Sequence, residues 1–327
     1  MRGLRQAVVA AACSGFLALL IGCGNAQAGW KSAPVLPRLD GATQKKLIAT
    51  VGKGRRMGDR PDVFAKVGDS ISQSPAFLQG LGCGRLEGLP ALLRPSLRYF
   101  AERRLAGRST DCTPVNSFSR NSAATRAYMP SGWALLPGGS ADPTCGTDET
   151  PVACEIRAIR PAYAVILLGT NDVNFGNAIG VDPLDGYLAR IRRIVKTARR
   201  SGVVPILNTI PPRLDSAAAE ETTEALNAGL YRLAAARHVP LINLWRAFQP
   251  LPNRGLSTDG EHPSLYGGPD CTGLCDPNKC APACDAGNLT PAGLRYGHNL
   301  RNLITLTTLW RLSRLAREGP IKRNPDA

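Results

Sequence analysis

The segment A-Y-A-V-I-L-L-G-T-N-D at residues 162–172 decides the fold class of this chain. Its first seven residues form a continuous apolar run, which is typical of a strand that is buried on both faces of a sheet. The small and polar residues G-T-N-D at 169–172 follow where that strand should end. The segment therefore predicts a buried strand with chemically useful side chains at its carboxyl end.

The regions on either side of this segment continue an alternation of strands and helices. Further strands are predicted at Val63–Val67, Val203–Ile210 and Val239–Leu244, and helices at Ala91–Arg104, Leu184–Arg200, Ser216–Arg237 and Thr290–Arg314. Pro291 suits the first turn of the last helix. Strands that alternate with helices indicate an α/β fold in which helices cover both faces of a parallel sheet.

Three polar segments follow predicted strands. They read V-G-D-S at 67–70, G-T-N-D at 169–172 and D-G-E-H-P at 259–263. In open parallel sheets, ligands bind beyond the carboxyl ends of the strands. We therefore expect the three segments to converge on one cleft.

The side chains of these segments suit nucleophilic catalysis. The Ser70 hydroxyl is a weak nucleophile until a base takes its proton, and a neutral histidine such as His262 does this near neutral pH. Asp259 lies three residues before His262, close enough to orient the imidazole. Asn171 offers an amide N–H to an oxyanion. Asp69 is expected to orient the serine loop.

The remaining polar candidates near these segments receive structural roles. We expect Asp172 to buttress Asn171. His238 ends a predicted helix, where a cation interacts favourably with the helix dipole. His298 lies in the last predicted helix and is interpreted as structural.

On these three segments, the chain resembles the SGNH (GDSL-type) hydrolase superfamily, over roughly residues 63–310. The resemblance implies a flavodoxin-like three-layer α/β/α sandwich with about five parallel strands. It implies Ser70 as nucleophile, with Asp259 and His262 completing the catalytic set. The oxyanion donors would be the Ser70 N–H, the Asn171 side chain and a third backbone N–H.

The third donor departs from the family pattern. The family has a glycine in its second block, and the nearest match here is R-N-S-A-A-T at 120–125, with Ala123 at the glycine position. A backbone N–H survives a change from glycine to alanine where φ is negative. Ala123 is the assigned donor, and its neighbours Ser122 and Ala124 remain alternatives.

The amino terminus predicts export. Arg2 and Arg5 precede the apolar run Ala7–Gly22, which is too short for a membrane-spanning helix and typical of a secretory signal. Cleavage after Ala26-Gln27-Ala28 would release a free protein, whereas a bacterial lipobox reading would make Cys23 a lipidated first residue. The alternative to both is a buried hydrophobic helix.

The chain accordingly divides into five parts. They are a signal at 1–28 (or 1–22), a leader at 29–60, a hydrolase-like domain at 61–316, a Cys-rich insert within it at 265–289, and a tail at 317–327. We interpret the insert as a disulfide-pinned loop beside the cleft.

Cysteine usage agrees with an oxidising compartment. Eight of the ten cysteines lie beyond the signal, at positions 83, 112, 145, 154, 271, 275, 280 and 284. An even number in an exported chain indicates disulfides, although the sequence leaves their connectivity open. The last four form a C-x3-C-x4-C-x3-C cluster, for which a zinc site is the alternative.

Charge points to anionic partners. The formal net charge is +15, and signal cleavage removes two arginines and no acid, which leaves +13. A basic surface attracts anionic lipid, acidic polysaccharide or nucleic acid, and the last is not expected for an exported enzyme. The run Arg190–Arg200 holds five arginines and one lysine, and either contacts an anionic surface or forms a solvated helix face.

The functional expectation is an exported serine ester hydrolase that acts through an acyl-enzyme and needs no metal or organic cofactor. Its substrate is a small-molecule or polysaccharide ester. Carbohydrate esters are favoured over lipids because the chain lacks a long apolar segment for a lipid surface. The alternatives are an acyltransferase that uses the same residues and a non-catalytic cell-surface binding protein on the same fold.

Overall fold

The computed structural model describes residues 29–110, 112–267 and 286–319. The chain divides into two units, Met1–Ala33 and Pro34–Ala327. Of the first unit, residues 29–33 are described, and they contain the 3-10 helix η1, Trp30–Ser32. All other elements described below belong to the second unit.

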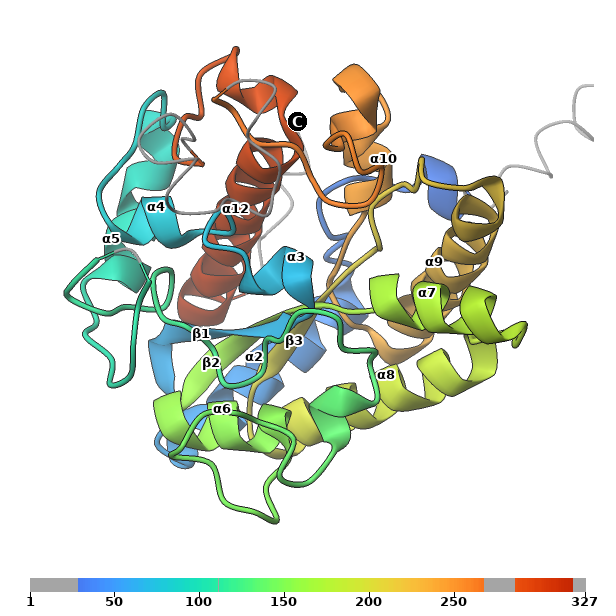
Figure 1. Ribbon diagram of the computed structural model, residues 1–327. Coiled ribbons are helices and arrows are strands. Elements are labelled where there is room, and N and C mark those ends of the chain that lie inside the picture. Colours follow the sequence, from blue (N-terminus) through green and yellow to red (C-terminus); the bar gives the residue numbers. More distant parts are fainter. Residues whose placement is uncertain (1–28, 111, 268–285, 320–327) are drawn as a thin grey trace, which may run out of the picture. The chain divides into compact units, whose positions relative to one another are not determined.

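A parallel sheet of four strands forms the centre of the second unit (Figure 1). The strands are β1 (Arg60–Gly68), β2 (Pro161–Leu167), β3 (Val204–Asn208) and β4 (Leu241–Ile242), and they pair in chain order. The register pairs Gly68 of β1 with Leu167 of β2. The segments that follow these two strands therefore leave the sheet side by side.

Helices surround the sheet (Figure 1). The α-helices are α2 (Gly41–Arg56), α3 (Ser70–Gln73), α4 (Gln79–Gly82), α5 (Arg94–Ala101), α6 (Pro151–Ile159), α7 (Thr170–Ile179), α8 (Leu184–Arg200), α9 (Ala217–Arg237), α10 (Leu244–Phe248) and α12 (Gly297–Glu318). Short 3-10 helices are η2 (Ala91–Leu93), η3 (Trp133–Leu135), η4 (Pro252–Gly255) and η5 (Gly293–Arg295).

Two apolar cores lie on opposite faces of the sheet. Side chains that alternate along β1 enter different cores: Val63 and Ala65 pack with α6, α8 and α9, and Phe64 packs with α2, α5, α10 and α12. Successive strand residues point to opposite faces, so this split is what a sheet covered on both sides requires. The predicted three-layer α/β/α sandwich is confirmed.

The predicted fifth strand is reduced to a single bridge among the described residues. Beyond β1, the position next to the sheet is occupied by Thr125, which forms an isolated parallel bridge with Gly68. The Gly68 N–H donates to Ala124 O, and the Arg126 N–H donates to Gly68 O, both at 3.0 Å. The segment then turns away, so the sheet has four strands rather than about five.

Most predicted elements appear, with different ends. The helix at Leu184–Arg200 has the predicted bounds, and Ser216 caps α9 through its side chain. The last helix starts at Gly297 rather than Thr290, because Ser264 accepts hydrogen bonds from its first N–H groups. The Gly297 N–H donates to Ser264 Oγ at 3.1 Å, and the His298 N–H donates to Ser264 O at 2.9 Å. Pro291 therefore lies outside this helix.

The predicted leader at 29–60 holds a helix of the core. Asp40 caps α2 by accepting from the Thr43 N–H at 2.7 Å, and Leu47 and Val51 are buried against the sheet. Only the part before α2 fits the description of a leader. The signal, Cys23, most of the Cys-rich insert and residues 320–327 of the tail lie outside the described residues.

Two disulfides join four of the eight cysteines, Cys83 with Cys112 and Cys145 with Cys154. The cluster at 271–284, with its zinc alternative, lies outside the described residues. Within the described ranges, helices with the length and apolar character of a membrane span are absent.

Candidate active site

Ser70 lies at the turn where β1 gives way to α3. The preceding residue, Asp69, is fully buried and caps α3 by accepting from the Ile71 N–H at 3.1 Å. This bond fixes the first turn of the short helix and, with it, the position of the serine. This hydrogen bond supports the expected role of Asp69 in orienting the serine loop. The role of Ser70 as nucleophile stays a prediction.

The loop after η4 brings His262 to the serine. Ser70 Oγ and His262 Nε2 are 2.9 Å apart, across 192 positions of sequence. His262 Nδ1 lies 2.8 Å from Asp259 Oδ2. The other carboxylate oxygen, Oδ1, accepts from the N–H groups of Glu261 and His262 at 2.9 Å and from Ser257 Oγ at 2.7 Å. Asp259 is thereby locked onto its own loop.

These contacts define the proton arrangement. An ionised Asp259 accepts the proton on His262 Nδ1, which leaves Nε2 free to accept from the Ser70 hydroxyl. The pKa of Asp259 falls well below its ordinary value, because its hydrogen bonds outweigh its partial burial. Burial lowers the pKa of His262, but the hydrogen bond and charge of Asp259 outweigh burial and raise it above 6.5. The three residues form the chain that proton transfer needs.

Asn171 occupies the first turn of α7, directly after β2. It is buried, and its Nδ2 makes no hydrogen bond within the described residues. A buried donor without a partner costs about 1–3 kcal/mol, so such a group is retained where a ligand uses it. Because β1 and β2 are adjacent, the Asn171 and Ser70 turns leave the same sheet edge. Its oxyanion role stays a prediction with this support.

Replacing Asn171 with alanine is expected to lower kcat for an activated ester by about 10²–10³, with little change in KM. The reason is that a developing oxyanion loses a donor which the ground-state carbonyl uses weakly. Steady-state kinetics measure the effect, and Asn171→Asp serves as the isosteric variant without the donor. A KM effect with unchanged kcat would show that Asn171 binds substrate rather than the transition state.

The Ala123 N–H is not available in the way the sequence predicts. It donates to Glu155 Oε2 at 2.9 Å, and the same oxygen accepts from Arg120 Nη1. Both charged side chains are almost fully buried. The neighbouring Ala124 N–H donates to Ser122 Oγ. This segment is therefore anchored by a buried ion pair, and the assignment of Ala123 as oxyanion donor is corrected: its N–H is occupied.

Sequence reasoning missed Arg301 of α12, which hydrogen-bonds to the two residues that follow Ser70. Its Nη1 donates to Ile71 O at 2.7 Å and its Nη2 to Ser72 Oγ at 2.9 Å. Its guanidinium lies 3.5 Å from the centre of the Phe77 ring. Burial lowers the pKa of Arg301 to about 9, and burial raises the pKa of Asp69 to about 7 despite the nearby Arg301 charge. No motif marked this arginine.

Sequence reasoning also missed Arg213, which joins the histidine loop to α7. Its Nε and Nη2 bind both carboxylate oxygens of Asp215 at 2.7 Å. Nη2 also donates to Asn174 Oδ1 at 2.8 Å and to Glu261 Oε2 at 3.3 Å. Glu261 precedes His262, and Asn174 lies one helical turn after Asn171. Arg213 follows Pro211-Pro212 at the end of β3, and this strand-end position was the available signal.

Replacing Arg213 with methionine is expected to lower kcat about tenfold to a hundredfold while KM changes little, because small displacements of catalytic groups are costly. Arg314→Met is the control, since Arg314 pairs with Glu318 of α12 and contacts neither Arg213 nor Glu220 nor the histidine loop. Recovery of activity with added guanidinium ion distinguishes positioning from general destabilisation. An equal loss in both variants would contradict the positioning role.

The remaining polar residues singled out in the sequence make structural contacts or are buried. Asp172 accepts from Ser131 N and Oγ at 2.7 and 2.6 Å and from Arg190 Nη2 at 2.8 Å, which anchors the start of α7. His238 caps the end of α9, and His298 is fully buried. In the described part of the chain, groups of three or more His, Cys, Asp or Glu arranged to hold a metal are absent. The expectation that no cofactor is needed stays a prediction.

Comparison with known proteins gives one family and several similar folds. The profile of the GDSL-like Lipase/Acylhydrolase family matches residues 67–267, more than half of the chain. No curated protein sequence matches significantly.

Three solved structures illustrate the structural similarity. A carbohydrate esterase family 3 protein from Talaromyces cellulolyticus has 15% identity and a TM-score of 0.47, covering 79% of this chain and 99% of its own. An acetylxylan esterase from Geobacillus stearothermophilus has 14% identity and a TM-score of 0.44, covering 75% and 93%. A GDSL-like lipase from Bacteroides thetaiotaomicron has 15% identity and a TM-score of 0.42, covering 77% and 89%.

The matched region runs from the residues before Ser70 to the residues after His262, and so contains all three strand-end segments. The resemblance noted in the sequence is thereby confirmed by a family match that is independent of the hydrogen-bond geometry. The chain belongs to the GDSL-like lipase/acylhydrolase family, and ester hydrolysis is the activity that this membership supports.

Proposed function

We propose that this protein is a serine esterase that works through an acyl-enzyme. His262 takes the proton of the Ser70 hydroxyl, and the oxygen attacks the ester carbonyl. The tetrahedral oxyanion is held by the Ser70 N–H and Asn171. Its collapse expels the alcohol, which receives the proton from His262. Water, activated by the same histidine, then cleaves the acyl-serine and releases the acid.

The observation that carries this proposal is the unbroken contact chain from Ser70 Oγ through His262 to Asp259, with distances of 2.9 and 2.8 Å. A serine, a histidine and a carboxylate in this order suit nucleophilic catalysis and have no comparable structural purpose. The buried, unpartnered Nδ2 of Asn171 adds support. The intact set also favours an enzyme over a binding protein that has lost turnover.

A polar pocket supports an ester of a hydroxyl-rich molecule as the substrate. The pocket has a volume of about 720 Å³, and one of its lining residues is Gln73, one turn of helix after Ser70. Most of its lining side chains are polar or charged, and they include Arg108, Asn121, Thr125, Arg126 and Ser140. Such side chains match the many donors and acceptors of a sugar better than an acyl chain. We therefore propose a carbohydrate ester with a short acyl group.

Two substrate series test this function. Nitrophenyl esters of increasing acyl length and acetylated sugars are assayed with the wild type, and Ser70→Ala is the control. We expect the highest kcat/KM with acetyl esters and acetate release from the sugars. Faster turnover of long acyl chains would contradict the proposed substrate class. Acylated sugar as the main product, when a free sugar is added, would identify a transferase.

The activity is expected to fall with acid. His262 acts as a base only when neutral, so kcat/KM should drop about tenfold per pH unit below the pKa of His262. The pKa of His262 is raised from its ordinary value of 6.5, so the midpoint should lie above 6.5. Asp259→Asn removes the hydrogen-bonded charge and should move the midpoint down. A pH–rate profile measures both, and a flat rate down to pH 5 would contradict this role.

We further propose that the enzyme acts outside the cytoplasm. The amino-terminal signal pattern and the disulfides Cys83–Cys112 and Cys145–Cys154 support this compartment, because disulfides persist mainly in oxidising surroundings. Mass analysis of the mature amino terminus tests the proposal. Cleavage before Gly29 means free secretion, a lipidated Cys23 means anchoring, and an intact Met1 in purified native protein would contradict export.

A further inference from the structure

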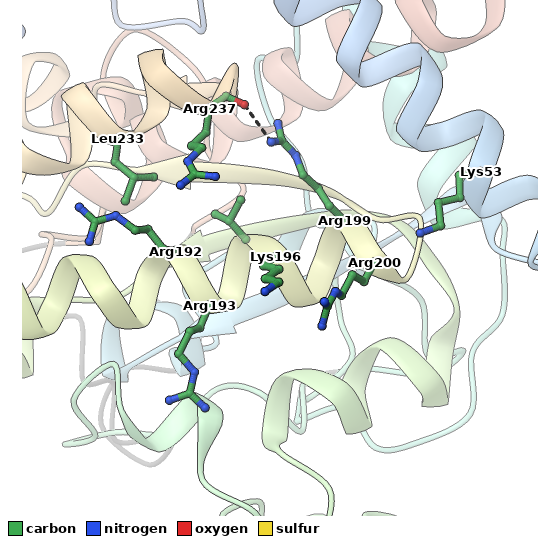
Figure 2. Close-up of a pocket in the computed structure, with 9 residues that line it drawn as sticks. Lys53, Arg192, Arg193, Lys196, Arg199, Arg200, Leu233 and Arg237 are labelled. Carbon is green, nitrogen blue, oxygen red and sulfur yellow. Dashed lines mark hydrogen bonds between the residues drawn. The ribbon is translucent and has the colours of Figure 1, made fainter.

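A basic groove lies on a different part of the surface from Ser70. It has a volume of about 540 Å³ and lies over α8, with contributions from α9 and α2 (Figure 2). Five of its seven cations occupy the second half of α8, which leads to the amino end of β3, whereas Ser70 follows the carboxyl end of β1. The groove is separate from the polar pocket beside Gln73, because the two share no lining residue.

The groove concentrates positive charge without acidic partners. No Asp or Glu lines the groove. Seven of its nine lining residues are Lys or Arg, namely Lys53, Arg192, Arg193, Lys196, Arg199, Arg200 and Arg237. Within the described residues, none of the seven takes part in an ion pair with a carboxylate. Six of the seven are exposed. Like charges in one hollow repel one another, so this arrangement favours an anionic ligand.

One of the seven cations has a structural role. Arg199 donates to Arg237 O and His238 O at 2.8 Å and so closes the carboxyl end of α9, as the dashed bond to Arg237 in Figure 2 illustrates. Burial lowers the pKa of Arg199, and the charge of Arg237 lowers it further. The cations left for a ligand are therefore those whose side chains are exposed.

We propose that this basic groove binds a linear anionic polysaccharide. Arg192, Lys196 and Arg200 follow one another at intervals of four residues, which places their Cα atoms about 6 Å apart along the helix axis. A chain of acidic sugars carries one carboxylate on every residue, at regular short intervals along the chain. Such a polymer can therefore pair with several of these cations at once, and the proposal does not depend on the chemistry of Ser70.

The lining also favours this ligand over a membrane surface and over a single-stranded nucleic acid. The apolar residues of the groove, Val195 and Leu233, are buried at its floor. Peripheral membrane binding combines cations with exposed apolar side chains that enter the lipid, and none lines this groove. Single-stranded nucleic acids stack their bases on aromatic side chains, and the lining contains no aromatic residue. A hollow whose exposed side chains are all cations fits a hydrophilic chain best.

The test measures binding of polygalacturonate to the full-length mature protein by calorimetry at low and at physiological salt. The variant Arg192→Gln/Lys196→Gln/Arg200→Gln is expected to bind at least about tenfold more weakly, which corresponds to the loss of a few charge contacts. Its rate with nitrophenyl acetate should equal that of the wild type. This readout keeps a failure of the groove separate from a failure of the esterase proposal and confirms that the variant is folded.

The matched control removes three positive charges from exposed positions outside the groove, as Lys45→Gln/Lys46→Gln/Arg104→Gln. It should retain binding within about threefold. Equal weakening in both triple variants would mean that net charge alone attracts the polymer, and would overturn the proposed site. Tighter binding of the wild type to phosphatidylglycerol vesicles or to an oligonucleotide than to polygalacturonate would overturn the proposed ligand.

Discussion

Replacing Ser70 with alanine should lower kcat for an activated ester by at least about 10⁴-fold and abolish covalent labelling, since the nucleophile is lost. The remaining rate would come from binding and oxyanion stabilisation alone. The substitution removes one hydroxyl, which hydrogen-bonds to His262. The fold should therefore be kept, and the melting temperature should change by only a few degrees.

The measurement is a burst and steady-state assay on the purified variant, with circular dichroism as the folding control. Contamination by another esterase is excluded by titrating active sites in the wild type. A folded Ser70→Ala protein with the wild-type rate would place the chemistry elsewhere in the molecule.

The second large effect is expected for His262. Replacement with glutamine keeps a polar side chain of similar reach but removes the base, and should lower kcat by about 10⁴-fold or more. Because Ser70 and His262 act as one unit, the double variant Ser70→Ala/His262→Gln should be no slower than the worse of the two single variants.

The double-mutant cycle is measured with one ester at one pH, above the pKa of His262. Losses that multiply in the double variant would show that the two residues act independently, against the 2.9 Å contact between Ser70 Oγ and His262 Nε2. The His262 side chain is only 12% exposed, so circular dichroism of each variant confirms that the fold is kept.

The layers of the fold could be predicted because strong local patterns mark them. The run at 162–168 is apolar throughout, and the strand found there, β2 at Pro161–Leu167, is buried at every position. Leu188, Ile191 and Val195 recur at helical spacing, and α8 has the predicted bounds. Helix boundaries that depend on distant residues, and helices with few apolar residues, could not be predicted from the sequence. The start of α12 depends on Ser264, more than thirty positions earlier, and the helix at 41–56 carries only a few apolar residues among lysines and glycines.

The candidate site shows the same division. Ser70, His262 and Asp259 follow predicted strands, so their convergence could be expected from topology. The occupation of the Ala123 N–H by Glu155 could not, because it depends on a buried pair with Arg120 that joins distant segments. Arg213 and Arg301 act through backbone carbonyls and neighbouring side chains, and such contacts have no sequence spacing. The structure therefore adds the groups that hold the predicted residues in place.

The central claim is that the hydroxyl of residue 70 is activated by the imidazole of residue 262. The most direct test is the rate of covalent labelling by a fluorophosphonate, with the modified peptide mapped by mass spectrometry. We expect one adduct, on Ser70, that forms far more slowly in His262→Gln. Labelling at another residue, or an unchanged labelling rate without the imidazole, would contradict it.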